Sequence, residues 1–371
     1  MTKNGSGDGK RILMLATDAH GGFGGISQYN RDVLEALNGF NGIREIVVVP
    51  RAADAGSVNA PAKVRYDLAG TAGELSFARR TMAQAFAGRR YDLIYCAHIN
   101  LLPLAKLVAY VQRAPLLLAI YGIDGWWRPS RPMVGRLASR AELVISISQT
   151  TLDRFLSWST IDPAATAVLP NAIRVEQFGL AEKNSELLQQ LGIERRKIIM
   201  TLGRMSSDER AKGFDEVIEL MPRLREAEPD IAYIAAGDGD DRPRLEAKAK
   251  MLGVADRVVF AGRIPEAQKR DYYRLADAYV MPSCWEGLGF VVLEALACGT
   301  PVVASSVDGT QEAVRGGELG AVVDPKDQTA LLSAIIAALR RPKQIPAGLA
   351  YFAFDNFATR LHGALRRVID I

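Results

Sequence analysis

The sequence contains few of the residues on which disulfide frameworks and metal centres depend. Among its 371 residues, the cysteines are Cys96, Cys284 and Cys298, and the histidines are His20, His98 and His362. Neither set has the spacing of a zinc motif, and no serine–histidine–acid arrangement can be read from the spacing. All three cysteines lie in apolar surroundings, so we expect them to be reduced in a cytoplasmic protein.

Long hydrophobic runs are also missing. No uninterrupted apolar run of about 18 residues occurs, whereas a membrane-spanning helix needs about 20. The first ten residues are small and polar, without the apolar core of a signal peptide, and we expect them to be disordered. With 49% hydrophobic residues, the chain has enough apolar material for two domains, each with its own core.

The net charge of +4 is unevenly distributed along the chain. Residues 1–170 carry 19 Lys and Arg against 13 Asp and Glu, and the remainder carries 27 against 29. Prominent in the basic half are Arg79, Arg80, Arg89, Arg90, Arg128, Arg131, Arg136 and Arg140. These side chains form either solvated helix faces or a patch for anionic lipid or a phosphate-bearing acceptor. The segment Trp126-Trp127-Arg128 could lie at a membrane interface, be buried, or line an acceptor site.

Short apolar runs alternate with helical patterns along the whole chain. The predicted strands are residues 11–17, 46–50, 93–98, 116–121 and 143–148, then 198–202, 231–236, 258–261, 278–281, 301–304 and 321–323. Runs that are apolar throughout favour parallel sheets covered by helices on both faces. The pattern therefore predicts an α/β protein with two doubly wound domains.

The predicted domains are residues 1–172 and 173–350, followed by an amphipathic helix over 351–371. The first boundary is placed near Leu169-Pro170-Asn171, ahead of a polar helical stretch. Ligands of open α/β sheets bind at the carboxyl ends of the strands, so we expect a site in a cleft between the two domains.

Two carboxylates, Glu286 and Glu294, mark an apolar stretch that predicts a helix over residues 287–297: Glu286 lies just before its first turn and Glu294 lies within it. A carboxylate in such a helix is unfavourable unless a polar group meets it. Along a helix, the two would lie about 12 Å apart. This geometry suits a ligand with hydroxyls at two places and an anionic group between them, such as a sugar nucleotide.

A glycine-rich loop, His20–Gly25, follows the first predicted strand and precedes a helix. Such a loop lets backbone N–H groups approach an anion. It lacks the Lys-Ser/Thr of a Walker A loop, and Ser27 stands where a dinucleotide fingerprint needs glycine. A plain tight turn remains an alternative.

A second loop carries two cations, Arg204 and Lys212, after the predicted strand 198–202. They could neutralise a diphosphate, the arginine as a fork and the lysine as a point charge, or they could be solvated loop charges. The Asp238-x-Asp240 spacing could hold a divalent metal, but turn and capping chemistry explain it adequately.

Together these motifs resemble the retaining glycosyltransferases of family 4. The resemblance covers nearly the whole chain and is strongest over residues 282–305, with further matches at 261–266 and 308–314. It implies a GT-B fold of two Rossmann-like domains, with the acceptor in the first and the nucleotide sugar mainly in the second. It also implies that the terminal helix crosses back to the first domain.

The resemblance implies the following donor-site residues: Gly24, Gly25, Arg204, Lys212, Arg263, Ile264, Glu286, Leu288, Gly289, Phe290 and Glu294. Glu294 would bind the ribose hydroxyls and Glu286 the hydroxyls of the donor sugar. Arg204 and Lys212 would hold the diphosphate. Backbone N–H groups of residues 288–290 would help to bind phosphate or sugar, the backbone of residues 263–264 would meet the base, and the two first-domain glycines would close over the phosphates.

Tyr121 departs from the family pattern, because many relatives carry a histidine at the position before Gly122. A phenol can hydrogen-bond a sugar hydroxyl but cannot carry a positive charge near neutral pH. His98 and His20 are the candidates to take the place of that histidine. The catalytic candidates are therefore Arg204, Lys212, Glu286, His98 and Tyr121.

The favoured reaction is transfer of a hexose from a nucleoside diphosphate sugar, UDP before GDP, to a hydroxyl of a glycan or lipid-linked acceptor. Retention of configuration is expected, with neither a metal nor another cofactor. Such an enzyme would serve polysaccharide or glycolipid synthesis in the cytoplasm, with peripheral contact to the inner membrane face and no nucleic-acid partner. The alternatives are a sugar-nucleotide epimerase or phosphorylase on the same scaffold, and a non-catalytic nucleotide-sugar-binding module.

Overall fold

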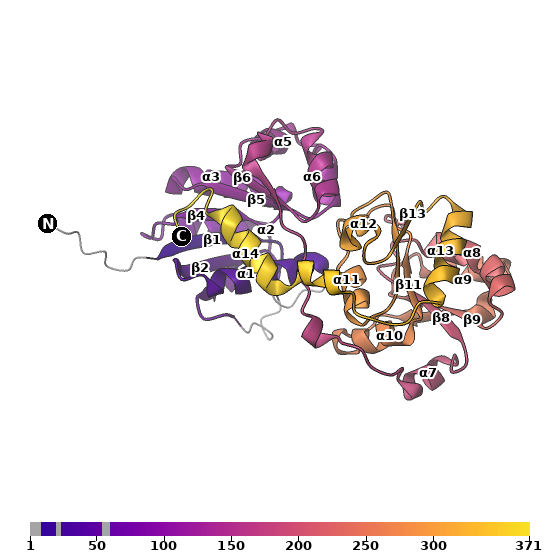
Figure 1. Cartoon of the computed structure of the whole chain (residues 1–371). Helices are drawn as coiled ribbons and strands as arrows, with labels where there is room; N and C mark the ends of the chain where they lie inside the picture. Colours follow the sequence, from indigo (N-terminus) through magenta and orange to yellow (C-terminus); the bar gives the residue numbers. More distant parts are fainter. Residues whose placement is uncertain (1–8, 20–23, 54–59) are drawn as a thin grey trace. The chain divides into compact units, whose positions relative to one another are not determined.

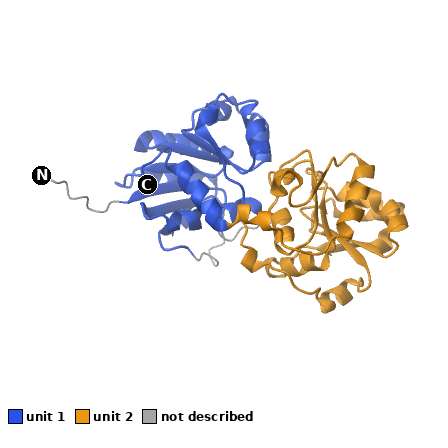
Figure 2. Ribbon diagram, viewed as in Figure 1, with its two compact units in different colours: residues 1–172, 354–371 blue, residues 173–353 orange. Residues whose placement is uncertain are grey.

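The computed structural model describes residues 9–19, 24–53 and 60–371. The chain divides into two compact units (Figure 2). The first unit combines Met1–Ala172 with Phe354–Ile371, and the second is Ile173–Ala353.

The described part of the first unit contains a seven-stranded parallel sheet in the order β3-β2-β1-β4-β5-β6-β7 (Figure 1). Its strands are β1 Lys10–Ala16, β2 Ile43–Pro50, β3 Val64–Tyr66, β4 Leu93–Cys96, β5 Leu116–Ile120, β6 Leu143–Ser146 and β7 Thr166–Val168. Its helices are α1 Gly25–Gly39, α2 Glu74–Ala85, α3 Leu102–Gln112, α4 Ile123–Trp126, α5 Pro132–Ala138, α6 Gln149–Leu156 and α14 Phe354–Leu365. Strands β4, β5 and β6 are buried along their whole length, as expected of a sheet covered on both faces.

The last helix, α14, packs on α1 of the first unit, although about 180 residues of the second unit separate it from the rest of that unit. Phe357 is fully buried, and its ring meets Tyr29 edge-on with the ring centroids 5.5 Å apart. His362 stacks at a tilt on Phe40, with a centroid separation of 4.6 Å. The apolar spacing of this segment therefore serves to anchor the chain end on the first unit.

The second unit contains a six-stranded parallel sheet in the order β10-β9-β8-β11-β12-β13. Its strands are β8 Lys197–Leu202, β9 Ile231–Ala236, β10 Val258–Gly262, β11 Ala278–Met281, β12 Val302–Ser305 and β13 Ala321–Val323. Its helices are α7 Ser185–Leu191, α8 Phe214–Ala227, α9 Arg242–Met251, α10 Lys269–Leu275, α11 Phe290–Ala297, α12 Thr310–Ala313 and α13 Gln328–Leu339.

The predicted fold class, two doubly wound α/β domains, is confirmed. Two strands were not predicted, β3 and β7, and each has only three residues at a sheet edge. The helix predicted over residues 287–297 begins instead at Phe290, because Gly289 adopts a left-handed backbone with φ of 89°. Glu286 and Glu294 are therefore not on one helix.

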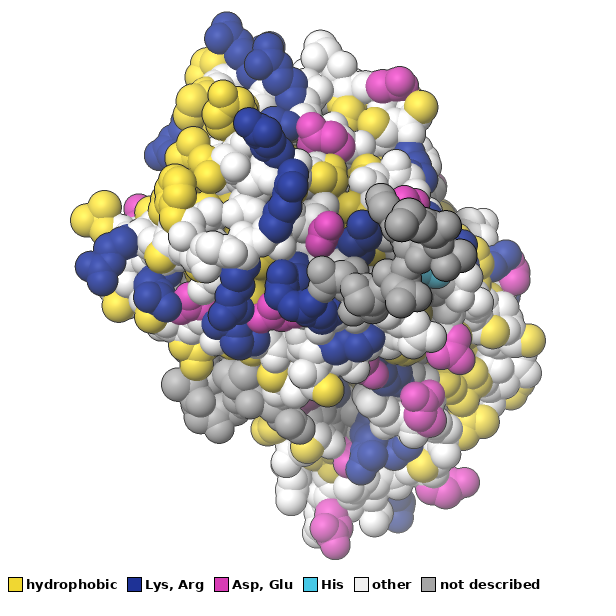
Figure 3. Space-filling view, turned by 90° about the vertical axis from the view of Figure 1, so that its left-hand side faces the viewer, with side chains coloured by type: hydrophobic (Ala, Val, Ile, Leu, Met, Phe, Trp, Pro, Cys, Tyr) yellow, Lys and Arg dark blue, Asp and Glu magenta, His cyan; other side chains and the backbone are white. Residues whose placement is uncertain are grey.

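One surface of the first unit is both basic and apolar. Helices α3 and α5 pack against each other, and Tyr110 and Met133 are 82% and 58% exposed on them. We use the name α3–α5 face for the exposed side chains of these two helices and of the residues that follow them, Leu107, Tyr110, Arg113, Met133, Arg136 and Arg140. Figure 3 shows one face of the molecule on which Lys and Arg side chains lie beside hydrophobic ones. Within the described ranges, no helix has the length and apolar character needed to span a bilayer.

Candidate functional site

Three loops of the second unit lie at one edge of its sheet, because β8, β11 and β12 are parallel neighbours. They are residues 203–213 after β8, 282–289 after β11 and 306–309 after β12. The carboxyl ends of the strands form this edge, where open α/β sheets bind their ligands. Most of the predicted donor-site residues lie in these loops or in α11, which follows them.

Backbone hydrogen bonds join the three loops. The Cys284 N–H donates to the Ala211 carbonyl at 2.8 Å, and the Gly309 N–H donates to the Glu286 carbonyl at 2.9 Å. A side chain at Gly309 would not fit, since its Cβ would lie 1.8 Å from the Gly287 carbonyl oxygen. The loops therefore form a single tightly packed surface rather than three independent segments.

Lys212 and Glu286, predicted from separate motifs, form an ion pair. The lysine Nζ lies 2.6 Å from a Glu286 carboxylate oxygen, and the two side chains are 16% and 21% exposed. Burial alone lowers the pKa of Lys212, but the Glu286 carboxylate raises it, and the net shift is upward. The ammonium group therefore stays charged at neutral pH and keeps hydrogens free for a second acceptor.

Asp308, which sequence reasoning did not single out, holds Glu286 in place. This carboxylate is fully buried and accepts hydrogen bonds from the Glu286 N–H at 2.9 Å and the Ser283 hydroxyl at 2.6 Å. Its other oxygen accepts from the Thr310 hydroxyl and N–H at 2.7 and 3.0 Å. Burial raises the pKa of Asp308 to about 6, against the lowering effect of these bonds. The only sequence signal was its place in a segment that matched the family pattern.

Glu294, in α11, is met by polar groups of the protein itself. It is 7% exposed, accepts a hydrogen bond from the Tyr273 hydroxyl at 2.6 Å, and lies 3.6 Å from the Lys269 ammonium. Burial raises the pKa of Glu294, while Lys269 and then Tyr273 oppose that shift. Glu294 therefore has the polar partners that a carboxylate in an apolar helix requires, and both come from α10 rather than from a ligand.

Gly289 determines how α11 begins beside Glu286. A Cβ at this position would lie 3.3 Å from the Glu286 Cγ, closer than an ordinary contact. Leu288 is fully buried, whereas Phe290, the first residue of the helix, is partly exposed. The N-terminus of α11 is thus placed next to the Lys212–Glu286 pair, and helix N-termini attract anions.

Arg204, the second predicted diphosphate ligand, lies in the same loop as Lys212 but is 66% exposed. Its guanidinium group pairs with Glu209 at 2.6 Å. Because an exposed ion pair is worth only about 0–1 kcal/mol, a ligand phosphate can replace the Glu209 carboxylate at little cost.

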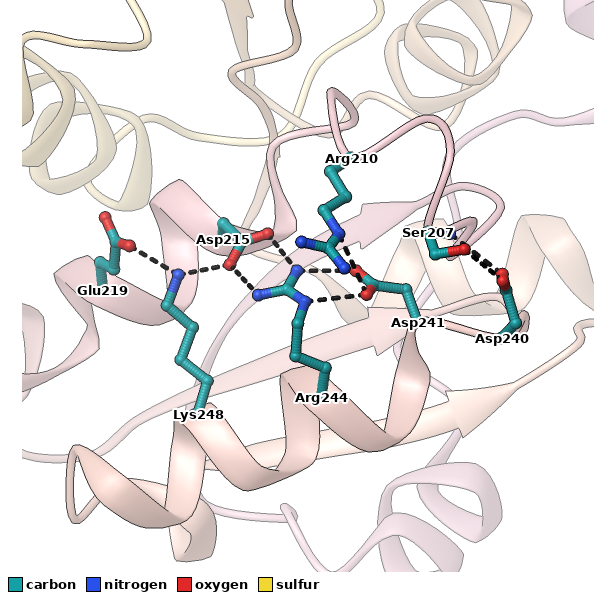
Figure 4. Close-up of polar contacts among 8 residues, drawn as sticks. All are labelled: Ser207, Arg210, Asp215, Glu219, Asp240, Asp241, Arg244 and Lys248. Atoms are coloured by element: carbon teal, nitrogen blue, oxygen red, sulfur yellow. Dashed lines mark hydrogen bonds and ion pairs between the residues drawn. The ribbon is translucent and has the colours of Figure 1, made fainter.

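The acidic run after β9 is occupied by contacts within the protein (Figure 4). Asp240 accepts hydrogen bonds from the N–H and hydroxyl of Ser207, and Asp241 pairs with Arg210 at 3.3 Å and Arg244 at 2.6 Å. Over residues 9–19, 24–53 and 60–371, no group of three or more His, Cys, Asp and Glu side chains is arranged to hold a metal ion.

These contacts support the loop that carries Arg204 and Lys212. Arg244 also binds Asp215 through two hydrogen bonds of 2.8 and 2.6 Å, and Asp215 lies in the first turn of α8. The loop is therefore fixed at its middle by Asp240 and Asp241 and at its end by α8, which begins at Phe214.

Arg263 and Ile264 directly follow β10, at the same edge of the sheet. Ile264 is buried and Arg263 is exposed. The Gly262 carbonyl accepts a hydrogen bond from the Gly237 N–H at 2.8 Å, which ties this segment to the loop after β9.

The first unit also presents predicted residues at the carboxyl ends of its strands. Gly24 caps α1 with φ of 119°, and Gly25 is the first residue of that helix. Both are exposed. His20 and Gly22, from the same loop, lie outside the described residues.

The Tyr121 hydroxyl is used within the fold. It donates to the Asn30 side-chain oxygen at 2.8 Å, and its ring meets Tyr29 edge-on at 5.3 Å. Tyr121 is buried, and burial raises its pKa well above the usual value, so the phenol stays neutral. The bond to Asn30 links the end of β5 to α1.

His98, by contrast, has a ring nitrogen, Nε2, without a hydrogen-bond partner among the described residues. Its Nδ1 accepts a hydrogen bond from the Asn100 N–H at 3.1 Å. Burial, and then the nearby Arg51, lower the pKa of His98, so the ring is neutral at neutral pH. Because Nδ1 is an acceptor, the proton of the neutral ring is on Nε2, which can donate to a hydroxyl oxygen.

Asp124 is a second carboxylate that the sequence analysis did not select. One of its oxygens accepts the Tyr121 N–H at 2.9 Å, and the other is buried without a hydrogen-bond partner among the described residues. Burial raises the pKa of Asp124 to about 7. The residue therefore exchanges a proton near neutral pH beside the residues at the end of β5.

Comparison with known families gives two matches that together span most of the chain. Residues 183–347 match the family model described as Glycosyl transferases group 1, and residues 23–177 match Glycosyltransferase Family 4. The two matched segments fall on the second and first units, respectively.

Among curated proteins, the chain is 32% identical to a GDP-mannose-dependent α-(1-6)-phosphatidylinositol monomannoside mannosyltransferase of Mycolicibacterium smegmatis, over 71% of this chain and 72% of that protein. It is 29% identical to a D-inositol 3-phosphate glycosyltransferase of Streptomyces bingchenggensis, over 72% of this chain and 65% of that protein. Among solved structures, Anabaena HepE in complex with UDP and glucose matches with a TM-score of 0.77 at 22% identity, covering 96% of this chain and 99% of HepE.

Proposed function

We propose that this chain, which belongs to glycosyltransferase family 4, transfers a hexose from a nucleoside diphosphate sugar to an acceptor hydroxyl, with retention of configuration and without a metal ion. Glycosyl transfer follows from the family, whereas the donor, the acceptor and the stereochemistry are the proposal. The observation that carries it is the Lys212–Glu286 pair, held by Asp308 beside the N-terminus of α11.

Stabilising the charge of the leaving diphosphate is the main electrostatic task of such a reaction. Lys212 would supply a fixed charge, because its ammonium group is mostly buried and already oriented by Glu286. Arg204 would supply a mobile one, because it is exposed and its partner among the described residues is Glu209. The backbone N–H groups at the start of α11, from Leu288 to Phe290, would add the positive end of the helix dipole.

The two carboxylates would recognise the two ends of the donor. Glu286 would accept hydrogen bonds from the sugar hydroxyls with the lone pairs that Lys212 leaves free, and Glu294 would accept them from the ribose. Tyr273 and Lys269 hold Glu294 for that role. The backbone around Arg263 and Ile264 would contact the base, and Gly24 and Gly25 would approach the phosphates.

In the reaction, the bond between the anomeric carbon and the phosphate oxygen breaks as the acceptor oxygen attacks from the same face. The acceptor proton passes to the leaving phosphate oxygen, so no side-chain nucleophile is needed. In the first unit, His98 is better suited than Tyr121 to position a hydroxyl, since its Nε2–H is available while the Tyr121 hydroxyl is bound to Asn30.

UDP is the first candidate for the nucleotide and GDP the second. UDP is the commoner donor, and HepE is a fold neighbour crystallised with UDP. GDP is favoured by the Mycolicibacterium smegmatis relative, which is named as a GDP-mannose-dependent mannosyltransferase. A thermal-shift panel of UDP, GDP and ADP sugars decides between them, since only a bound ligand stabilises the fold.

For the acceptor, we propose a hydroxyl on a glycan or a lipid-linked molecule. One relative is named for a phosphatidylinositol monomannoside and the other for D-inositol 3-phosphate. The set of acceptors to be tested should therefore include polyol phosphates. Nucleoside diphosphate should appear only when acceptor and donor are both present. If the sugar nucleotide alone were converted to an epimer, the enzyme would be an epimerase instead.

Access to a lipid-linked acceptor would use the α3–α5 face at the inner surface of the cytoplasmic membrane. Exposed arginines beside Tyr110 and Met133 combine attraction to anionic lipid with apolar insertion. The protein should co-sediment with anionic but not neutral vesicles at low salt. The double variant Arg113→Glu with Arg136→Glu should abolish this binding to vesicles. Arg195→Glu, at an exposed site in the second unit, should not abolish it. Equal binding by all variants would show that the α3–α5 face does not contact the membrane.

A further inference from the structure

The second unit contains a pocket at the edge of its sheet opposite the three loops of the candidate site. Lys197 is the first residue of β8, and Asp277 immediately precedes β11, so both mark the amino ends of their strands. The pocket has a volume of about 650 Å³, which lies within the range of roughly 300–1,000 Å³ typical of small-molecule sites.

This pocket is distinct from the proposed donor site. Lys197 and Gly203 lie at opposite ends of β8, and six residues of a strand span about 20 Å. None of the residues assigned to donor binding lines the pocket.

Cations dominate the lining of the pocket. Four basic side chains, Lys183, Lys197, Arg341 and Lys343, face two acids, Glu182 and Asp277. Asp277 is already satisfied, because both its oxygens lie 2.8 Å from the Lys183 ammonium and one also accepts the Ile198 N–H at 2.8 Å. Asp277 therefore pairs first with Lys183, although its charge also acts on Lys343, and among the described residues Glu182 is the only other acid that lines the pocket beside the remaining three cations.

Those three cations retain donors for a ligand. The Lys343 ammonium donates to the Arg274 carbonyl, which occupies one of its three hydrogens. The side chains of Lys197 and Arg341 form no ion pair or hydrogen bond with any residue that the structure describes.

Lys343 is also in an environment that disfavours its own charge. Burial, followed by the nearby Lys183, lowers the pKa of Lys343 to about 8. An anion bound in the pocket would offset both effects and raise that pKa. The site thus has the charge imbalance expected of an anion site, in a place that the glycosyl transfer does not use.

We propose that this pocket binds a small phosphate-bearing anion, either inorganic phosphate or a phosphate monoester, through Lys343, Arg341 and Lys197. Arginine contributes a fork of donors suited to phosphate and the two lysines contribute point charges. A pocket of this volume is much larger than a phosphate ion, so it has space for the organic part of a monoester. The proposal does not depend on the identity of the sugar donor.

Isothermal titration with inorganic phosphate and, separately, glycerol 3-phosphate tests the site. We expect a dissociation constant of about 1 mM or tighter for at least one of the two probes. Lys343→Gln combined with Arg341→Gln should weaken binding by at least about tenfold, since two charge-assisted contacts are removed. Lys250→Gln combined with Arg223→Gln, which removes the same charge from exposed sites on α9 and α8, should leave binding unchanged.

A second pair of variants separates this pocket from the proposed donor site. Arg204→Gln combined with Lys212→Gln should retain phosphate binding if the pocket holds the anion. Binding lost in these variants and kept in the pocket variants would place the phosphate in the donor site and overturn the proposal. The proposal would also be overturned if neither inorganic phosphate nor glycerol 3-phosphate bound measurably to the wild-type protein. Tighter binding of the monoester than of inorganic phosphate would identify a monoester as the ligand, and the reverse order would identify free phosphate.

Discussion

Replacing Lys212 by methionine separates the structural and the catalytic contributions of the Lys212–Glu286 pair. Methionine keeps the length of the side chain and removes only the ammonium group. In the variant, the Glu286 carboxylate remains beside the buried Asp308 but loses its partner at 2.6 Å. A charge-assisted hydrogen bond is worth about 1.5–3 kcal/mol, so we expect Lys212→Met to lower the free energy of unfolding by about that amount.

Neutralising the carboxylate as well should recover part of that stability. The double variant Lys212→Met with Glu286→Gln has no unpaired charge at this position, so about 1–2 kcal/mol should return as coupling energy. Activity should not return with it. Removing one preorganised donor from a developing anion costs about 100- to 1,000-fold in turnover, and neither variant restores the ammonium group.

The two quantities are measured on the same three proteins. Urea unfolding gives the stability, and release of nucleoside diphosphate from the donor gives kcat/KM. If Lys212→Met lost stability but kept kcat/KM within about threefold of wild type, Lys212 would be a structural residue and its role at the diphosphate would be refuted. If the double variant regained activity along with stability, the loss in the single variant would have come from misfolding alone.

Three further predictions concern the residues around this pair. Gly289→Ala should lower the free energy of unfolding by about 1 kcal/mol and should also lower enzymatic activity. Gly253 also has a positive φ but has open space around it, so Gly253→Ala should lower the free energy of unfolding alone. Equal activities of the two variants would argue against a close contact at Gly289. Asp308→Ala should raise the KM for the sugar nucleotide about tenfold or more, because buried N–H and O–H groups such as the Glu286 N–H lose their hydrogen-bond acceptor. An unchanged KM would show that Asp308 does not position Glu286. Tyr273→Phe should shift the acid limb of the pH profile of kcat/KM to higher pH, because the Tyr273 hydroxyl lowers the pKa of Glu294. An acid limb that did not move would show that Glu294 does not take part in binding the sugar nucleotide.

The sheets of both units were predictable because their strands are buried along most of their length. A strand covered on both faces reads as a continuous apolar run, and β9 and β11 begin and end where the sequence placed them. The edge strands β3 and β7 have three residues each and no such run, so their existence depends on pairing with a neighbour. Sequence pattern alone could not identify them.

Sequence reasoning proposed residues for the candidate site but could not predict the contacts among them. The ion pair of Lys212 with Glu286 joins residues 74 positions apart, and the bond of Tyr273 to Glu294 joins a phenol and a carboxylate on different helices. Spacing along the chain contains no information on either contact. Asp308 was missed for the same reason, since its importance comes from four donors that tertiary packing brings around one carboxylate.

Glycine geometry accounts for the incorrect start of α11. The apolar run predicts a helix from residue 287, but a left-handed glycine ends the preceding loop two residues later. Composition suggested a helix that starts directly after Glu286, whereas the left-handed backbone of Gly289 keeps residues 287–288 in the loop from which Glu286 pairs with Lys212.

NMR of a complete reaction tests the central claim most directly. The purified protein is incubated in EDTA with the sugar nucleotide that stabilises it and an acceptor from the panel, and the anomeric configuration of the product is compared with that of the donor. We predict a glycoside with the configuration of the donor, formed together with an equal amount of nucleoside diphosphate. A product of inverted configuration, or turnover that stops in EDTA and resumes only with a divalent metal, would contradict the account.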